Sequence, residues 1–214
     1  MECLMYFVKE IFKSIQGEGF YSGRPATFIR FTGCNLWNGK ITSRGNATCS
    51  FCDTDFVGTN GLNGGEYNAN QLIKKVKESW KSSFCPTQKF VVLTGGEPLL
   101  QVDQFLVNKL KESGFEVAVE TNGTVESSIN FDWVCVSPKE NSSWKLKKGD
   151  EVKIVYPQYK FNLKKILKLD FKYFFLQPMY NQKSRININK TIEYCKSHKP
   201  WFPSFQIHKS LGIS

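Results

Sequence analysis

Three of the seven cysteines lie in one stretch of the sequence and are spaced to hold a metal centre. They follow the pattern Cys34-x14-Cys49-x2-Cys52. A Cys-x2-Cys pair brings two thiolates within reach of one centre, and a third thiolate can fold back onto it. Structural zinc needs a fourth ligand, whereas a 4Fe–4S cluster held by three thiolates keeps one iron open for a substrate or cofactor. The spacing alone does not decide between the two centres.

A fourth ligand for zinc has no obvious source near this stretch. The two histidines, His198 and His208, lie far away in the sequence, and Cys85 is a possible fourth ligand that no other feature of the sequence supports. Cys135 and Cys195 fall within a predicted strand and a predicted helix, where we interpret them as small core residues.

The turn Thr94-Gly95-Gly96-Glu97-Pro98 is a second candidate for chemistry. It follows an apolar strand and precedes a helix. Its glycines allow a ligand to approach the backbone, and Pro98 is suited to the first turn of a helix. The free backbone groups and the Glu97 carboxylate suit the ammonium and carboxylate of an amino acid. Two glycines alone would indicate an ordinary turn, but their combination with a three-cysteine loop is more specific.

The elements that must position these residues alternate along the chain. Continuous apolar strands separated by amphipathic helices predict an α/β fold with a parallel sheet, and ligands of such folds bind beyond the carboxyl ends of the strands. Residues 33–65 lack apolar periodicity and are predicted to form a long functional loop. We predict strands at 9–14, 26–31, 90–93, 115–119, 133–136, 152–156, 173–176 and 205–208, and helices at 70–80, 102–110, 162–169 and 187–196.

Composition indicates a globular chain of 214 residues, which we interpret as a single domain over residues 1–214. It is 41% hydrophobic and 22% charged, which excludes disordered and fibrous classes. The formal net charge is +10, but only four of the 29 basic residues are arginine. We interpret the lysines as a solvated surface and expect no direct binding to nucleic acid. No signal peptide or membrane-spanning segment is predicted, so we expect a cytoplasmic location.

The three-cysteine loop followed by Gly-Gly-Glu-Pro resembles the radical S-adenosylmethionine (SAM) superfamily. That superfamily usually spaces its thiolates Cys-x3-Cys-x2-Cys, and a longer gap is a feature of its 7-carboxy-7-deazaguanine synthase branch. The resemblance to this family extends from end to end. It includes Ile15-Gln16-Gly17-Glu18-Gly19, Ser22-Gly23-Arg24-Pro25, Arg30-Phe31-Thr32-Gly33-Cys34-Asn35-Leu36-Trp37, Cys52-Asp53-Thr54, Glu120-Thr121-Asn122-Gly123, Ser137-Pro138-Lys139, Gln177-Pro178-Met179 and His208-Lys209.

The resemblance implies a partial (β/α) barrel, a shortened radical SAM core, and a lyase of queuosine biosynthesis. A 4Fe–4S cluster on Cys34, Cys49 and Cys52 would bind SAM at its open iron, and Mg²⁺ would bind at Thr54. The SAM-derived radical would take hydrogen from C6 of 6-carboxy-5,6,7,8-tetrahydropterin, which becomes 7-carboxy-7-deazaguanine with loss of ammonia. No catalytic side chain is implied beyond this cofactor chemistry. An electron donor such as flavodoxin or ferredoxin and a homodimer are also implied.

The resemblance implies two sets of contact residues in this chain, one for SAM and one for the substrate. Among the substrate contacts, Arg30 has independent support, because a guanidinium in a predicted strand needs a partner, either the substrate carboxylate or a structural ion pair. His208 is equally well explained as a core histidine. The implied SAM contacts are Phe51, Cys52, Asp53, Gly96, Ser137, Pro138, Lys139, Gln177, Pro178, Met179 and Tyr180. The implied substrate contacts are Ile15, Gln16, Gly17, Glu18, Arg30, Thr94, His208 and the C-terminal Ser214.

Three alternatives remain at the level of sequence. A different radical enzyme, such as a glycyl-radical activase, would share the cysteines and Gly96 but would not need Gln16 or Glu18. A zinc module that binds RNA would bind it in a strongly salt-dependent way. An iron–sulfur electron carrier would not need the Gly-Gly-Glu-Pro turn.

Overall fold

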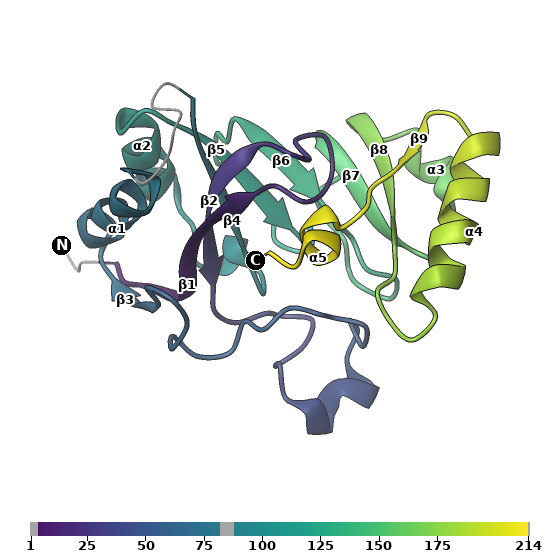
Figure 1. Cartoon of the computed structure of the whole chain (residues 1–214), viewed down its shortest axis with the longest axis horizontal. Helices are drawn as coiled ribbons and strands as arrows, with labels where there is room; N and C mark the ends of the chain where they lie inside the picture. Colours follow the sequence, from purple (N-terminus) through teal and green to yellow (C-terminus); the bar gives the residue numbers. More distant parts are fainter. Residues whose placement is uncertain (1–3, 82–87, 214) are drawn as a thin grey trace.

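The computed structural model describes residues 4–81 and 88–213. Cys3, Cys85 and Ser214 therefore lie outside the described residues. The described part of the chain forms a nine-stranded sheet with the order β3-β1-β2-β4-β5-β6-β7-β8-β9 (Figure 1). The strands are β1 (Tyr6–Ile15), β2 (Pro25–Phe31), β3 (Gly65–Tyr67), β4 (Lys89–Gly95), β5 (Phe115–Thr121), β6 (Trp133–Val136), β7 (Lys148–Tyr156), β8 (Asp170–Pro178) and β9 (Trp201–Pro203).

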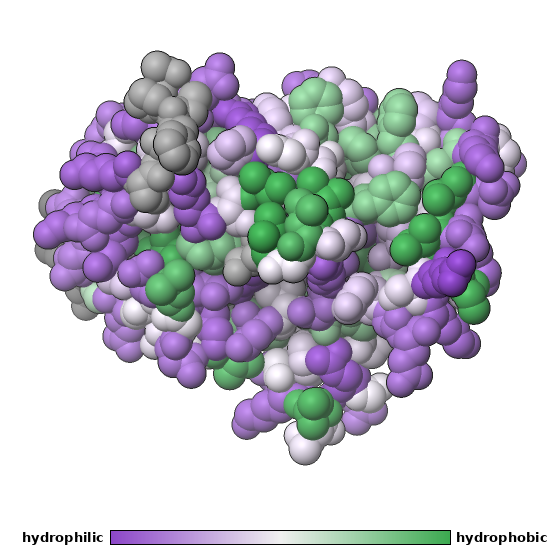
Figure 2. Space-filling view, in the orientation of Figure 1, coloured by the Kyte–Doolittle hydropathy of each residue, from purple (hydrophilic) through white to green (hydrophobic). Residues whose placement is uncertain are grey.

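Five α-helices and two short 3₁₀ helices are described. They are α1 (Ala69–Lys81), α2 (Gln104–Glu112), α3 (Leu163–Ile166), α4 (Ser184–Ser197), α5 (Ile207–Leu211), η1 (Ile41–Asn46) and η2 (Pro98–Leu100). None of the helices in the described ranges is long and apolar enough to cross a membrane. Hydrophilic side chains cover most of the face shown in Figure 2, in keeping with the lysine-rich composition.

The predicted α/β fold is confirmed, with an open sheet whose strands are mostly parallel. From β2 to β9 all neighbouring strands pair in parallel, whereas β1 pairs antiparallel with both β2 and β3. The sequence did not reveal this antiparallel start. Its cause is the short connection at residues 16–24, which holds no helix and so cannot carry the chain back for a parallel crossover.

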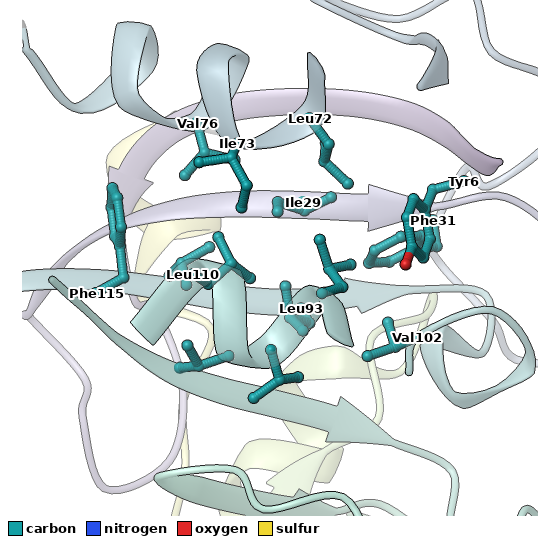
Figure 3. Close-up of a cluster of buried hydrophobic side chains, with 14 of the residues drawn as sticks. Tyr6, Ile29, Phe31, Leu72, Ile73, Val76, Leu93, Val102, Leu110 and Phe115 are labelled. Atoms are coloured by element: carbon teal, nitrogen blue, oxygen red, sulfur yellow. The ribbon is translucent and has the colours of Figure 1, made fainter. Parts of the chain in front are cut away.

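The main core lies between the sheet and helices α1 and α2. Leu72 and Val76 of α1 pack with Ile29 of β2 and Leu93 of β4, all four fully buried (Figure 3). A second core packs β7 and β8 against α3 and α4. Side chains of a strand alternate between its two faces, so the residues of β4 next to those of the main core point to the opposite face of the sheet. Phe90 is one such residue, and it belongs to a small apolar cluster on that face.

The predicted last strand at residues 205–208 is wrong. The edge strand β9 comes earlier, at Trp201–Pro203, and α5 begins at Ile207. Gly212 ends this short helix in the left-handed conformation, with φ of 66°, which glycine adopts without strain. The predicted helix at 162–169 shortens to α3. The long loop at 33–65 contains η1 and extends away from the sheet (Figure 1).

Candidate active site

A cavity of about 390 Å³ opens at the carboxyl ends of the parallel strands. Thr94 of β4, Glu120 of β5, Val155 of β7 and Gln177 of β8 line it. Strands β1 and β2, the segment at 16–18, the cysteine loop and the C-terminal segment with α5 supply further walls. The cavity thus lies where ligands of open parallel sheets bind.

All three clustered cysteines line this cavity. The thiols of Cys49 and Cys52 are hydrogen-bonded to each other, which raises the pKa of Cys49 and lowers that of Cys52. Burial raises the pKa of Cys34, whose sulfur accepts a hydrogen bond from the Leu36 backbone at 3.4 Å. The loop therefore gathers three thiols at one wall of the cavity.

Three thiols at one wall are the donor set that a 4Fe–4S cluster with one open iron requires, whereas structural zinc needs a fourth ligand. Among the described residues, no three side chains of His, Cys, Asp or Glu are already arranged around a single metal position. His198 stacks on Tyr194 in α4, with ring centroids 4.0 Å apart, away from this cavity.

Gly95, the last residue of β4, and Gly96 allow the backbone of this turn to pack directly on residues 31–33, where the cysteine loop begins. A Cβ on Gly96 would lie 2.0 Å from the carbonyl oxygen of Gly33, and one on Gly95 would lie 2.2 Å from that of Phe31. Gly95 also has a φ of 138°, which side chains rarely permit. Small residues here are what bring Cys34 to the ends of the strands.

Glu97 has a structural role in place of the ligand-binding role considered for it. Its carboxylate is fully buried and does not line the cavity. It accepts hydrogen bonds from Leu99 N at 3.0 Å, Thr121 Oγ1 at 2.7 Å and Asn122 N at 2.7 Å. Burial raises the pKa of Glu97, although the three hydrogen bonds oppose this shift. Glu97 therefore caps η2 and ties the ends of β4 and β5 together.

A buried lysine organises the acidic side of the cavity. Lys153 Nζ lies 2.6 Å from Glu18 Oε2 and 3.1 Å from Glu120 Oε2. Gln16 Nε2 donates to the other oxygen of Glu120 at 2.8 Å. Burial alone would raise the pKa of Glu18, but the Lys153 ammonium outweighs it and lowers that pKa to about 2. Gln16 and Glu18 both line the cavity, and so do Lys153 and Glu120, whose roles were missed from the sequence.

Arg30 has a partner within the protein. Its Nε donates to Glu10 Oε1 at 2.7 Å, and the two residues are direct neighbours across β1 and β2. The structural ion pair considered for Arg30 is therefore present. Both side chains still line the cavity, next to Thr94 on β4. Glu10 was missed, because its only sequence signal is a charge within an apolar strand.

The C-terminal segment closes one side of the cavity. Ile207 N donates to Gly17 O at 3.1 Å, and a Cβ on Gly17 would lie 1.9 Å from His208 Nδ1. His208 is half-buried and lines the cavity, so it is not a core histidine. Burial lowers its pKa, although the nearby Glu18 opposes this.

Most of the remaining predicted contacts also reach the cavity. Asp53 is ion-paired with Lys209 of α5, whose Nζ lies 3.8 Å from the centre of the exposed Tyr180 ring. Pro138 and Met179 do not line the cavity, and Met179 instead continues the pairing of β8 through its N–H to Tyr156 O at 2.8 Å. The other predicted residues that line it are Ile15, Gly17, Phe51, Asp53, Thr54, Gly96, Ser137, Lys139, Gln177, Pro178 and Tyr180.

An open parallel sheet with a three-cysteine loop at its carboxyl edge is the arrangement of a radical SAM enzyme. The chain is 47% identical over 211 residues to the 7-carboxy-7-deazaguanine synthase of Burkholderia multivorans and 49% identical over 211 residues to that of Bradyrhizobium diazoefficiens. Each alignment covers 98% of this chain and 100% of the relative. The crystal structure of QueE from Escherichia coli is similar with a TM-score of 0.72 and 26% identity over 94% of each chain. No protein-family model matches. The chain belongs to the 7-carboxy-7-deazaguanine synthase family.

Proposed function

We propose that this chain converts 6-carboxy-5,6,7,8-tetrahydropterin to 7-carboxy-7-deazaguanine and ammonia. Relatives aligned over their full length carry the name of this activity. The observation that carries the proposal is that one cavity is lined both by three thiols and by the polar residues Arg30, Gln16 and Glu18. A radical generated at the thiols would then form within reach of a polar heterocycle held by those side chains.

Cys34, Cys49 and Cys52 would hold a 4Fe–4S cluster, whose chemistry with SAM supplies a radical that abstracts hydrogen. The chain's own part is to place SAM beside it. The Gly95-Gly96 backbone lines the cavity and would meet the methionine end, and Asp53 offers a carboxylate to SAM once Lys209 moves off it. Lys139 Nζ, held 2.8 Å from Ser137 Oγ, supplies a positive charge on the same wall.

The substrate would lie between β1, β2 and β7. Arg30 would bind its carboxylate, because a guanidinium engaged with Glu10 through one nitrogen still offers further donors. Gln16 and Glu18 would bind the edge of the pterin, whose donors and acceptors suit an amide and a carboxylate. The Lys153 ammonium would hold Glu18 ionised at neutral pH, and the half-buried His208 would close the site over the ring.

We further propose Mg²⁺ at Thr54, whose hydroxyl is a hard oxygen ligand in the cavity. Mg²⁺ keeps several ligands from water or substrate, so one protein ligand is sufficient. An external one-electron donor such as flavodoxin or ferredoxin and a homodimeric assembly complete the proposal.

The test is an anaerobic incubation of iron-reconstituted protein with SAM, dithionite and 6-carboxy-5,6,7,8-tetrahydropterin, analysed by mass spectrometry. We expect both 5′-deoxyadenosine and 7-carboxy-7-deazaguanine. Deoxyadenosine alone would support radical chemistry on a different substrate. Neither product from protein that carries a full cluster would refute the proposal.

A further inference from the structure

Arg44 lies within the 14-residue segment that separates Cys34 from Cys49. This segment folds back on the cysteines instead of forming a free loop. Arg44 Nη1 donates to the carbonyl oxygen of Ser50 at 3.0 Å and to that of Cys52 at 2.8 Å. One guanidinium nitrogen thus fastens η1 to the turn that carries the second and third cysteines.

The guanidinium is also fixed on its other side. The Arg44 Cζ atom lies 4.2 Å from the centre of the Trp37 ring, close enough for a cation–π contact. Trp37 is only 7% exposed. It follows Cys34 by three residues, and its Nε1 donates to Ser43 Oγ at 3.2 Å. Arg44 therefore connects the segment after Cys34 to the Cys49–Cys52 turn.

We propose that Arg44 is a positioning residue for the iron–sulfur cluster: it clamps the two parts of the cysteine loop together and places a fixed positive charge beside the cluster. This inference rests on the proposed function, since it assumes that the three thiolates bind iron. The clamp would keep the thiolates at their spacing before and after iron binds. The charge would favour the more negative, reduced cluster, because opposite charges attract strongly where water is partly excluded.

The substitutions Arg44→Lys and Arg44→Gln separate the effect of the clamp from the effect of the positive charge. Lysine keeps the positive charge and can donate to a carbonyl, but it lacks the flat guanidinium that stacks on Trp37. Glutamine removes the charge as well. Because η1 has no buried residue, both variants are expected to fold. Arg185→Gln, at an exposed position of α4, is the matched control for the loss of an arginine.

The four proteins, wild type, Arg44→Lys, Arg44→Gln and Arg185→Gln, would be reconstituted anaerobically with iron and sulfide. The readouts are iron per chain, the rate of iron release to a chelator, and the midpoint potential of the cluster followed by electron paramagnetic resonance. We expect Arg44→Gln to release iron about tenfold faster, as loss of charge-assisted hydrogen bonds would cause, and to have a more negative potential. Arg44→Lys should keep a potential close to wild type while releasing iron at an intermediate rate.

The outcomes distinguish this inference from the proposed function. Iron release and potential in Arg44→Gln equal to those of the loaded wild type would overturn the role of Arg44 and leave the proposed function intact. A wild-type protein that binds no iron would overturn both. A faster release in Arg185→Gln equal to that in Arg44→Gln would show an effect that is not specific to the loop, and would also overturn the inference.

Discussion

Lys153 is the buried cation on which the acidic side of the cavity depends. Its side chain is 3% exposed and contacts Glu18 at 2.6 Å and Glu120 at 3.1 Å. Lys153→Met removes the charge while keeping much of the volume. Glu18 and Glu120 would then face each other without a counterion in a partly dry environment, which is costly for two carboxylates.

The size of the effect follows from the pKa of Glu18. In the folded protein this pKa falls from 4.5 to about 2, which corresponds to about 3 kcal/mol of stability at pH 7. The Glu18 side chain is only 14% exposed, so screening by water reduces this value little. Because the folded pKa lies below the unfolded one, the stabilisation is complete above pH 4.5 and is lost as the pH falls toward 2.

Urea unfolding of the metal-free protein, followed by circular dichroism, measures this effect. Lys153→Met should lower the free energy of unfolding at pH 7 by about 3 kcal/mol. Lys148→Met, at an exposed position of the same strand, should change it by less than about 0.5 kcal/mol. The difference between wild type and Lys153→Met should shrink as the pH is lowered below 4.5. A loss of less than about 1 kcal/mol at pH 7 would refute the reasoning.

Two further substitutions test the walls of the cavity. Gly96→Ala puts a Cβ 2.0 Å from the Gly33 carbonyl oxygen, whereas the added Cβ of Gly45→Ala meets nothing within 4 Å. We therefore expect lower iron binding and a lower Tm only for Gly96→Ala. Equal values for the two variants would contradict the close packing. Arg30→Gln should raise KM for the pterin at least about tenfold with a smaller fall in kcat, as loss of ground-state binding does, measured by anaerobic steady-state kinetics. An unchanged KM would show that Arg30 serves only its ion pair with Glu10.

Much of the fold follows from local patterns in the sequence. The strand at 133–136 coincides with β6, and the helix at 70–80 falls within α1, because apolar spacing reports directly which face is buried. The direction of β1 was not evident, since strand pairing depends on how the connection folds. The region of α5 was misread because Phe205 and Ile207 alternate with polar residues over too few positions to distinguish strand from helix.

The residues of the site also divide into those that the sequence revealed and those that it did not. The three cysteines and the two glycines at the end of β4, Gly95 and Gly96, were found from the sequence because their types and spacing are unusual. Lys153 and Glu10 were missed, since their partners are distant in the chain and only the folded sheet brings them together. A lysine between Val152 and Ile154 was the available signal, because a charge within an apolar strand needs a buried partner.

The central claim is that the radical chemistry acts on the pterin in the cavity that the three thiols line. The most direct test uses substrate carrying deuterium at C6, turned over anaerobically by the iron-loaded protein with SAM and dithionite. We predict that one deuterium appears in 5′-deoxyadenosine and that 7-carboxy-7-deazaguanine accumulates with it. Formation of 7-carboxy-7-deazaguanine together with 5′-deoxyadenosine that carries no deuterium would contradict the claim.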